Sequence, residues 1–397
     1  MKIEPQQTNR PRLLSFYIWG YYGSHNTGDD AMLTVIVDFL RQQFPDCLIG
    51  VTCEDPEWIK EQLGDKVSSV CACAGSFSIQ REWGFVQRLS KADIILMGGG
   101  TFFQDYGKHW INLLFRFFRM AALKLYGKKV LIIGAGVANL QTLIGKILTR
   151  LIVTLANGKC CFRDEESISY LQQLGVKPSK IQLTADLTFI HQHWTILDKK
   201  QSNLSTLDIG ISVLPYFEEI LCDKKQSKQF INWLSTNLDR LADLFPVRFH
   251  FISMKGGVSK NDYNYSERII QSMGHSDLAV RYPYHPDAND TVALISKMDI
   301  CLGMRLHFLL FSFLANIPTA AISYNQKVDS FMTMIGSSEN CLPCNENLFV
   351  TNLVPIIERM TSHKGFHKNR EEKLESLRVR AQSNFDEVVK LASPVSQ

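Results

Sequence analysis

The chain has 397 residues, of which 45% are hydrophobic and 21% charged, and its formal net charge is +4. This composition is typical of a folded globular protein of two or three domains, and it excludes a disordered chain, a fibrous repeat and a cysteine-stapled miniprotein. The charge is too small and too diffuse to indicate a nucleic-acid-binding protein. The first ten residues are polar and no apolar run reaches about 20 residues, so we expect a cytoplasmic protein whose ten cysteines are reduced.

Short apolar segments alternate with amphipathic segments through the first half of the chain. In chain order, we expect a strand at 13–19, a helix at 29–43, strands at 47–52 and 93–97 and a helix at 110–126. A strand at 129–133, a helix at 141–156, a strand at 160–162 and a helix at 165–174 follow. Three consecutive glycines, Gly98–Gly100, are expected to end the strand at 93–97. Buried strands that are each followed by a helix indicate a parallel sheet covered by helices.

The same alternation resumes after a polar stretch at 198–206, which we interpret as a linker. Strands are expected at 208–214, 247–254, 299–303 and 318–324, with helices at 227–244, at 290–298 and from Arg305 onwards. A last helix at 370–391 has apolar residues every three or four positions and a charged outer face. The chain therefore divides into an N-terminal α/β domain (1–200), a C-terminal α/β domain (207–345) and C-terminal helices (346–397).

Two doubly wound domains in one chain are expected to face each other across a cleft, and ligands of such sheets bind beyond the carboxyl ends of the strands. Candidate site residues are therefore sought in the turns that follow strands. In the N-terminal half these turns contain Asn26, Gly28 and Asp29, then Gly99, Gly100 and Asp105, and then Arg163. A structural interpretation is equally good for Asp29, as a helix N-cap, and for Asp105, as a solvent-exposed turn carboxylate.

The strongest local pattern is Arg305-Leu306-His307, which follows the strand at 299–303 and opens an apolar helix. The N-terminus of a helix presents unpaired backbone N–H groups and the positive end of the helix dipole, which together favour an anion. Arg305 adds a fixed positive charge, and His307 adds an imidazole that exchanges a proton near neutral pH. Lys327 follows the next strand and supplies a further positive charge.

Patterns for other chemistries are weak or missing. The segment Gly134–Asn139 follows a strand but lacks the third glycine of a dinucleotide fingerprint, and no acidic residue closes a strand about 20 positions later. The sequence has no paired Cys-x-x-Cys clusters, no Walker loop and no nucleophile elbow. We therefore expect neither a metal nor a bound cofactor.

Taken in order, these motifs resemble the polysaccharide pyruvyl transferase family. The first family motif is matched by Gly23, Asn26, Gly28 and Asp29, and the triple-glycine strand end with a following acid is matched by Gly98–Gly100 and Asp105. Further matches are Arg163, Asp164 and Ser167 with Leu174–Val176, then Ala185-Asp186, Arg305–His307, and Ser323, Tyr324 and Lys327. One departure is Ala135, where the family often has glutamine, and the chain beyond residue 340 is not covered.

The resemblance implies two Rossmann-like domains in a GT-B-like arrangement. It also implies transfer of pyruvate from phosphoenolpyruvate to two hydroxyls of a sugar in a cell-surface or exopolysaccharide glycan, which yields a cyclic ketal and phosphate. The residues implied for phosphoenolpyruvate are Arg163, Arg305, Leu306, His307 and Lys327, and those for the saccharide acceptor are Asn26, Gly28, Asp29, Gly99, Gly100 and Asp105. His307 is the candidate for proton transfer, and Asp29 is the candidate for orienting or deprotonating the acceptor.

Several alternatives stay open at this point. A nucleotide-sugar glycosyltransferase or epimerase would place a diphosphate at Arg305, and a non-catalytic sugar-binding relative would use the same cleft. The acceptor sugar, its lipid, nucleotide or polymer carrier and the oligomeric state are not identified. The helix at 110–126, with Phe118, Arg119 and Lys124, is interpreted as core-facing with a basic edge. The alternative places this helix on an anionic membrane surface, close to a lipid-linked acceptor.

Overall fold

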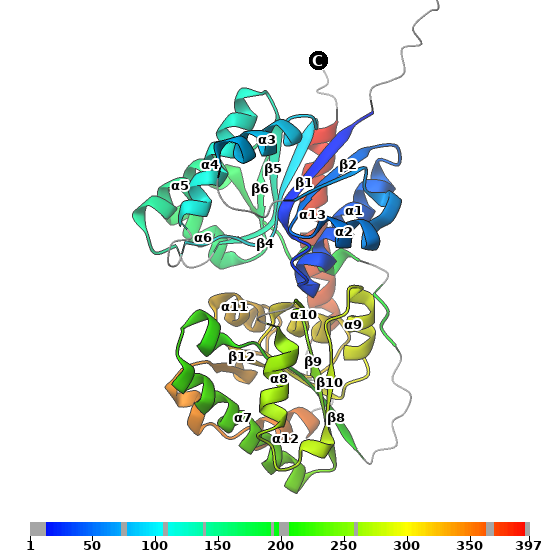
Figure 1. The fold of residues 1–397 in the computed structure, drawn as a ribbon, viewed down its shortest axis with the longest axis vertical. Coiled ribbons are helices and arrows are strands. Elements are labelled where there is room, and N and C mark those ends of the chain that lie inside the picture. Colours follow the sequence, from blue (N-terminus) through cyan, green and yellow to red (C-terminus); the bar gives the residue numbers. More distant parts are fainter. Residues whose placement is uncertain are drawn as a thin grey trace, which may run out of the picture.

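Two parallel α/β domains are stacked along the long axis of the molecule (Figure 1). The computed structural model describes residues 13–72, 78–105, 110–137, 140–191, 194–197, 206–257, 261–362 and 369–393. Most of the expected linker at 198–206 lies outside these ranges. The expected doubly wound architecture is confirmed in both domains.

Among the described residues, the N-terminal domain forms a seven-stranded sheet with the order β3-β2-β1-β4-β5-β6-β7. Its strands are β1 (Ser15–Tyr22), β2 (Leu48–Cys53), β3 (Ser69–Ala72), β4 (Ile94–Phe103), β5 (Lys129–Val137), β6 (Cys160–Phe162) and β7 (Ile181–Leu183). Its helices are α1 (Thr27–Gln43), α2 (Pro56–Leu63), α3 (Ile79–Leu89), α4 (Trp110–Leu125), α5 (Leu143–Leu155) and α6 (Glu165–Gln173). The strand order reverses between β1 and β4, which is where ligands bind in such sheets.

The C-terminal domain forms a six-stranded sheet within the described residues, with the order β10-β9-β8-β11-β12-β13. Its strands are β8 (Leu207–Ser212), β9 (Val247–Ile252), β10 (Ala279–Tyr282), β11 (Ile300–Gly303), β12 (Thr319–Ser323) and β13 (Cys341–Pro343). Its helices are α7 (Lys224–Leu244), α8 (Asp262–Ile270), α9 (Ala288–Ile295), α10 (Leu306–Leu314), α11 (Gln326–Met334) and α12 (Val354–Ser362). The order reverses between β8 and β11, so α10 begins at the second switch point.

The last helix returns to the first domain. Helix α12 packs against α7 and β11 of the C-terminal domain, whereas α13 (Arg370–Ala392) packs against β5 and the turn Leu187–Ile190 of the N-terminal domain (Figure 1). The amide oxygen of the buried Asn384 in α13 accepts a hydrogen bond of 2.8 Å from the backbone N–H of Gly134. The segment expected to form C-terminal helices is therefore divided between the two domains.

The triple glycine lies inside β4 and does not end it, contrary to the expectation from sequence. The ladder between β4 and β5 continues as far as Phe103. A Cβ at Gly98 would lie 2.0 Å from the carbonyl oxygen of Ile133, and Gly98 has a φ of +146°. The two backbones therefore approach too closely for a side chain, and glycine allows β4 to run on toward the second domain.

A single apolar cluster joins the two domains. It contains Ile36 of α1, Leu309 of α10 and Phe385 of α13, all of them fully buried. The backbone N–H of Thr27 also donates a hydrogen bond of 3.0 Å to the carbonyl of Met254, across the domain boundary. Residues that face the cleft from opposite domains are thus held together by a shared core.

Asp30 forms a buried polar contact between the domains. Its carboxyl group accepts hydrogen bonds from the hydroxyl of Tyr284 (2.9 Å) and the backbone N–H of Gly23 (3.3 Å). Burial raises the pKa of Asp30 to about 8, although these two hydrogen bonds oppose the shift. Folding therefore favours the protonated form of Asp30.

We expect the free energy of unfolding to fall as the pH rises from about 4, the ordinary pKa of an aspartic acid, to about 8. Over this range the folded chain holds a proton on Asp30 that the unfolded chain has released. Asp30→Asn keeps the uncharged shape and should reduce the total fall over this range by on the order of a few kcal/mol, because one pKa unit corresponds to about 1.4 kcal/mol. Urea denaturation across this range measures the slope. Asp46→Asn, at an exposed position, is the control, and an unchanged slope in Asp30→Asn would contradict the prediction.

Candidate active site

A cavity of about 510 Å³ lies between the facing edges of the two sheets. Its lining includes Asn26, Asp29, Gly99, Gly100 and Arg163 from the N-terminal domain and Arg305, Leu306, His307 and Lys327 from the C-terminal domain. The structure thus brings the candidate site residues to one place, with the exceptions of Gly28 and Asp105.

His307, in the first turn of α10, reaches across the domain boundary. Its ring lies against the backbone of Gly28 in α1, where a Cβ would sit 1.9 Å from Nδ1. Its Nε2 lies 3.4 Å from Oδ2 of Asp186. Gly28 therefore leaves room for the imidazole, which gives a packing reason for glycine at this position of the first motif.

Asp186 connects His307 with Arg163. Its Oδ2 accepts a hydrogen bond of 2.8 Å from Nη1 of Arg163, and its Oδ1 accepts one of 2.8 Å from the hydroxyl of Thr188. Burial by itself would raise the pKa of Asp186, but His307, Arg163 and Thr188 hold this pKa well below its ordinary value. An ionised carboxylate at this distance from Nε2 can orient the imidazole.

Asp29 faces the cavity from the first turn of α1. The N-cap of this helix is Asn26, whose amide oxygen accepts from the backbone N–H of Gly28, so the interpretation of Asp29 as the N-cap is wrong. Oδ2 of Asp29 instead accepts a hydrogen bond of 2.8 Å from Nδ2 of Asn26. Burial raises the pKa of Asp29, and positively charged side chains, His307 first among them, oppose the shift. A carboxylate with a raised pKa is suited to accept a proton from a hydroxyl.

Arg305 is fixed by a buried carboxylate. Its Nε and Nη2 donate hydrogen bonds of 3.1 and 2.6 Å to Oδ2 and Oδ1 of Asp262, which is fully buried. Asp262 also accepts from the backbone N–H groups of Met254 and Lys255. Burial would lower the pKa of Arg305, but Asp262 raises it above its ordinary value. Asp262 therefore sets the plane of the guanidinium group and offsets part of its charge.

The lining of the cavity has more cations than carboxylates, although Arg163 and Arg305 are each paired with a buried carboxylate behind it. Among the described residues its charged lining consists of the cations Arg163, Lys255, Arg305 and Lys327 and the carboxylates Asp29 and Glu54. Helices α10 and α11 begin beside this lining, so the positive ends of their dipoles add to the potential. The arrangement favours an anionic ligand next to an imidazole and a carboxylate that can exchange protons.

Lys255 and Asp186 are among the residues of this site that were not candidates from sequence. Lys255 follows β9 in the same way as Arg305 follows β11 and Lys327 follows β12, so the search of turns after strands could have included it. Asp186 belongs to a matched family motif, but its contact with His307 depends on how the two domains meet. No spacing along the chain indicates that contact.

Asp105 has a structural role in the N-terminal domain. Its carboxylate is fully buried and accepts hydrogen bonds from the backbone N–H groups of Gln141 (2.6 Å) and Thr142 (2.8 Å), immediately before α5. It is neither the solvent-exposed carboxylate nor the acceptor contact that the sequence suggested, because its oxygens are engaged in positioning α5. Ala135 is likewise buried in the sheet core, within β5.

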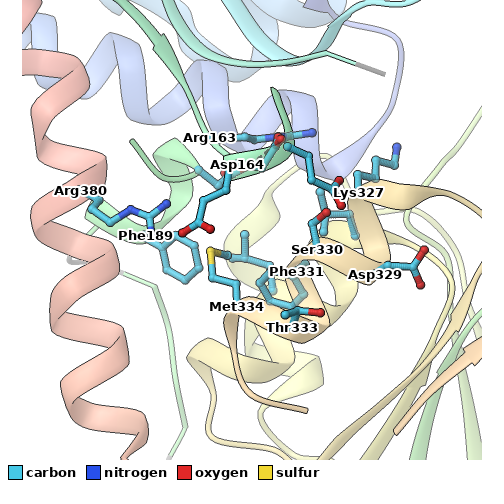
Figure 2. A pocket seen from close by; sticks show the side chains of 15 residues that line it. Arg163, Asp164, Phe189, Lys327, Asp329, Ser330, Phe331, Thr333, Met334 and Arg380 are labelled. Atoms are coloured by element: carbon cyan, nitrogen blue, oxygen red, sulfur yellow. Dashed lines mark hydrogen bonds and ion pairs between the residues drawn. The ribbon is translucent and has the colours of Figure 1, made fainter. Parts of the chain in front are cut away.

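A second cavity of about 460 Å³ adjoins the first, and Arg163, Leu306 and Lys327 line both. Figure 2 shows Arg163 and Lys327 on one side of it and Arg380 of α13 on the other. The remaining charged residues of its described lining are all acidic: Asp164, Glu165, Glu166, Asp186 and Asp329. An apolar side is formed by Phe189, Phe331 and Met334. In its described lining the second cavity therefore has more carboxylates than cations, unlike the first.

Two parallel-sheet domains around a cleft define a protein of the GT-B-like α/β class, and known structures share this fold. The putative UDP-N-acetylglucosamine 2-epimerase from Listeria monocytogenes aligns with a TM-score of 0.62 and 11% identity over 96% of both chains. The UDP-GlcNAc 2-epimerase from Neisseria meningitidis aligns with 0.59 and 12% over 95% of this chain and 100% of that chain. The lipopolysaccharide outer core galactosyltransferase WaaB aligns with 0.58 and 14% over 95% and 99%. At these identities the likeness shows the fold alone.

The sequence assigns the chain to one family within this class. The family model for polysaccharide pyruvyl transferases matches residues 26–326, and the chain belongs to this family. No curated protein matches the sequence. The resemblance seen in the ordered motifs is therefore confirmed.

Proposed function

We propose that this protein transfers pyruvate from phosphoenolpyruvate to two hydroxyls of a saccharide, forming a cyclic ketal and releasing phosphate. The observation that carries the proposal is the pairing of His307 with Asp186 beside a cavity whose lining has more cations than carboxylates. Membership of a family of polysaccharide transferases supports the same reaction.

The charge of the first cavity supports phosphoenolpyruvate as the donor. This compound carries a carboxylate and a phosphate, and such a ligand needs several cations or backbone N–H groups around it. Arg305, Lys327 and the start of α10 at Leu306 bind these anionic groups, while Arg163 contributes its charge from the opposite domain. Lys255 completes the cationic lining. The positive charge comes from side chains, so the proposal assigns neither a metal nor a bound cofactor.

His307 and Asp29 are proposed to move the protons. His307 donates a proton to the methylene carbon of phosphoenolpyruvate, so that C2 gains oxocarbenium character. Asp29 orients one acceptor hydroxyl and takes its proton as the oxygen attacks C2. The bond between C2 and the phosphate oxygen breaks, phosphate leaves, and the second hydroxyl closes the ketal. Of the two protons lost by the acceptor, one balances the proton gained by the methyl group and the other leaves with phosphate.

The acceptor is proposed to lie on the N-terminal side of the cavity. Asn26, Asp29, Gly99 and Gly100 line that side, and the two glycines expose backbone at the point where β4 meets the cavity. Asp29 lies within this group, which supports its role as the residue that meets the attacking hydroxyl.

A nucleotide-sugar-dependent enzyme is the second candidate, and the fold shared with UDP-GlcNAc epimerases and a galactosyltransferase favours it.

Pyruvyl transfer is tested by incubating the protein with phosphoenolpyruvate labelled with ¹³C at C2 and a panel of 4-nitrophenyl glycosides, and in a parallel reaction with a UDP-sugar. We expect phosphate release matched by a ketal carbon signal on a glycoside. Unchanged phosphoenolpyruvate, with turnover of a UDP-sugar instead, would contradict the proposal.

A further inference from the structure

The outer face of α5 exposes a stripe of large apolar side chains. Leu143, Ile144, Ile147 and Leu151 are 72%, 50%, 49% and 39% exposed, and Phe118 on the neighbouring α4 is 57% exposed. Their spacing along α5 places the four α5 residues on adjoining sides of the helix, over its first two turns and the start of the third. We call these five residues the α4–α5 apolar surface.

Packing of the domain does not account for this surface. Leu148, Ile152 and Val153 of α5 already fill the core against the sheet, and Leu113 and Met120 do the same for α4. The exposed residues therefore lie on the side of each helix that the fold leaves uncovered. Contiguous apolar surface of this kind marks an interaction site in a folded protein.

The charges around the surface are positive. The sequences of α4 and α5 contain no Asp or Glu. Arg119 of α4 pairs with Glu82 inside the domain, whereas the half-buried Lys146 and the exposed Arg150 of α5 lie along one edge of the apolar stripe. An apolar stripe flanked by lysine and arginine matches the boundary between acyl chains and anionic headgroups.

This surface lies close to the acceptor side of the cavity. Helices α4 and α5 follow β4 and β5, so both begin at the carboxyl edge of the N-terminal sheet (Figure 1). Gln104 and Asn112, which flank the start of α4, line the cavity itself. Asp105 binds the backbone immediately before α5. The starts of α4 and α5 therefore lie at the same edge of the N-terminal sheet as the cavity.

We propose that the α4–α5 apolar surface docks on an anionic lipid bilayer. No helix among the described residues is long and apolar enough to span a bilayer, so the contact is peripheral. A symmetric dimer through the same face would bring Lys146 and Arg150 of two copies together, with no carboxylate on either helix to pair with them. Charge thus favours anionic lipid over a second copy. One consequence, delivery of a lipid-carried acceptor to the cavity, rests on the proposed function.

The test is cosedimentation of the full chain with vesicles of phosphatidylcholine, with and without phosphatidylglycerol. We expect binding to the anionic vesicles that weakens as salt rises. Lys146→Glu/Arg150→Glu should weaken it by about 25-fold or more, since each basic residue near an anionic surface contributes about fivefold. Leu143→Ser/Ile147→Ser should also abolish most binding. Leu244→Ser/Val350→Ser, at exposed apolar positions of the C-terminal domain, is the matched control and should bind as the wild type does.

Each outcome has a definite meaning. Wild-type chain that stays in the supernatant with anionic vesicles overturns the proposal, as does an equal loss in the control variant. A dimer in light scattering that Leu143→Ser/Ile147→Ser dissociates would replace the bilayer by a second copy. Calorimetry with phosphoenolpyruvate separates the two proposals, because the α5 variants should bind this compound normally. Vesicle binding without phosphoenolpyruvate binding would leave the docking surface in place and contradict the proposed function.

Discussion

Replacement of His307 by alanine is expected to reduce turnover by about 10²–10⁴-fold, the usual contribution of a positioned acid–base group. The variant should stay folded, because alanine fits in the space beside Gly28 and Asp186 keeps its hydrogen bonds to Arg163 and Thr188. Turnover at saturating substrates and thermal unfolding measure the two effects separately.

The control for this variant is His285→Ala, at an exposed position on the C-terminal domain. It should retain wild-type turnover. Turnover of His307→Ala at the wild-type level would mean that another group protonates the donor, and the role given to His307 would be wrong.

The second large effect is expected for Asp186→Asn, with a loss of turnover of roughly 10²-fold or more. Asparagine keeps the shape of the side chain but removes the negative charge that lies 3.4 Å from Nε2 of His307. The limb of the pH–rate profile on which activity is lost as the proton donor His307 is deprotonated should therefore move to lower pH. Asp186 acts here as a positioning residue, and the shifted profile distinguishes this role from a purely structural one.

Stability must be followed in the same variant. Loss of one partner from a buried ion pair costs about 3–5 kcal/mol, and Asp186→Asn leaves the guanidinium group of Arg163 without its carboxylate. Activity is therefore measured at a temperature where circular dichroism shows the folded state. Asp186→Glu keeps the charge and should leave the pH–rate limb in place even where turnover falls. A limb that does not move in Asp186→Asn would contradict the proposed coupling.

Periodicity predicted the two sheets because buried parallel strands have a strong local signature. The apolar runs that became β1, β4, β5, β8 and β11 are each followed by a helical pattern, and this alternation specifies the doubly wound class. The extent of the strands was harder to predict. Glycine usually ends a strand, but at Gly98 the close approach of Ile133 makes glycine a requirement of the ladder.

The individual residues of the site were easier to predict from the sequence than the contacts between them. The search of turns that follow strands found Asp29, Arg305 and His307, because doubly wound sheets bind their ligands at such turns. The contact between His307 and Asp186 could not be predicted in this way, since it depends on the apolar cluster that joins the domains. Asp105 was predicted as a site residue because it follows a strand. In the structure its carboxylate has a structural role, since it accepts hydrogen bonds from the backbone immediately before α5.

Calorimetric titration with phosphoenolpyruvate and with UDP tests most directly whether the cavity between the domains holds the donor. We predict binding of phosphoenolpyruvate and not of UDP by the wild type. Lys327→Ala should weaken that binding by about 10- to 100-fold, the value of a hydrogen bond to a charged group, while Lys225→Ala, at an exposed position on α7, should bind normally. Binding of UDP in place of phosphoenolpyruvate, or an affinity that Lys327→Ala leaves unchanged, would contradict the assignment of this cavity.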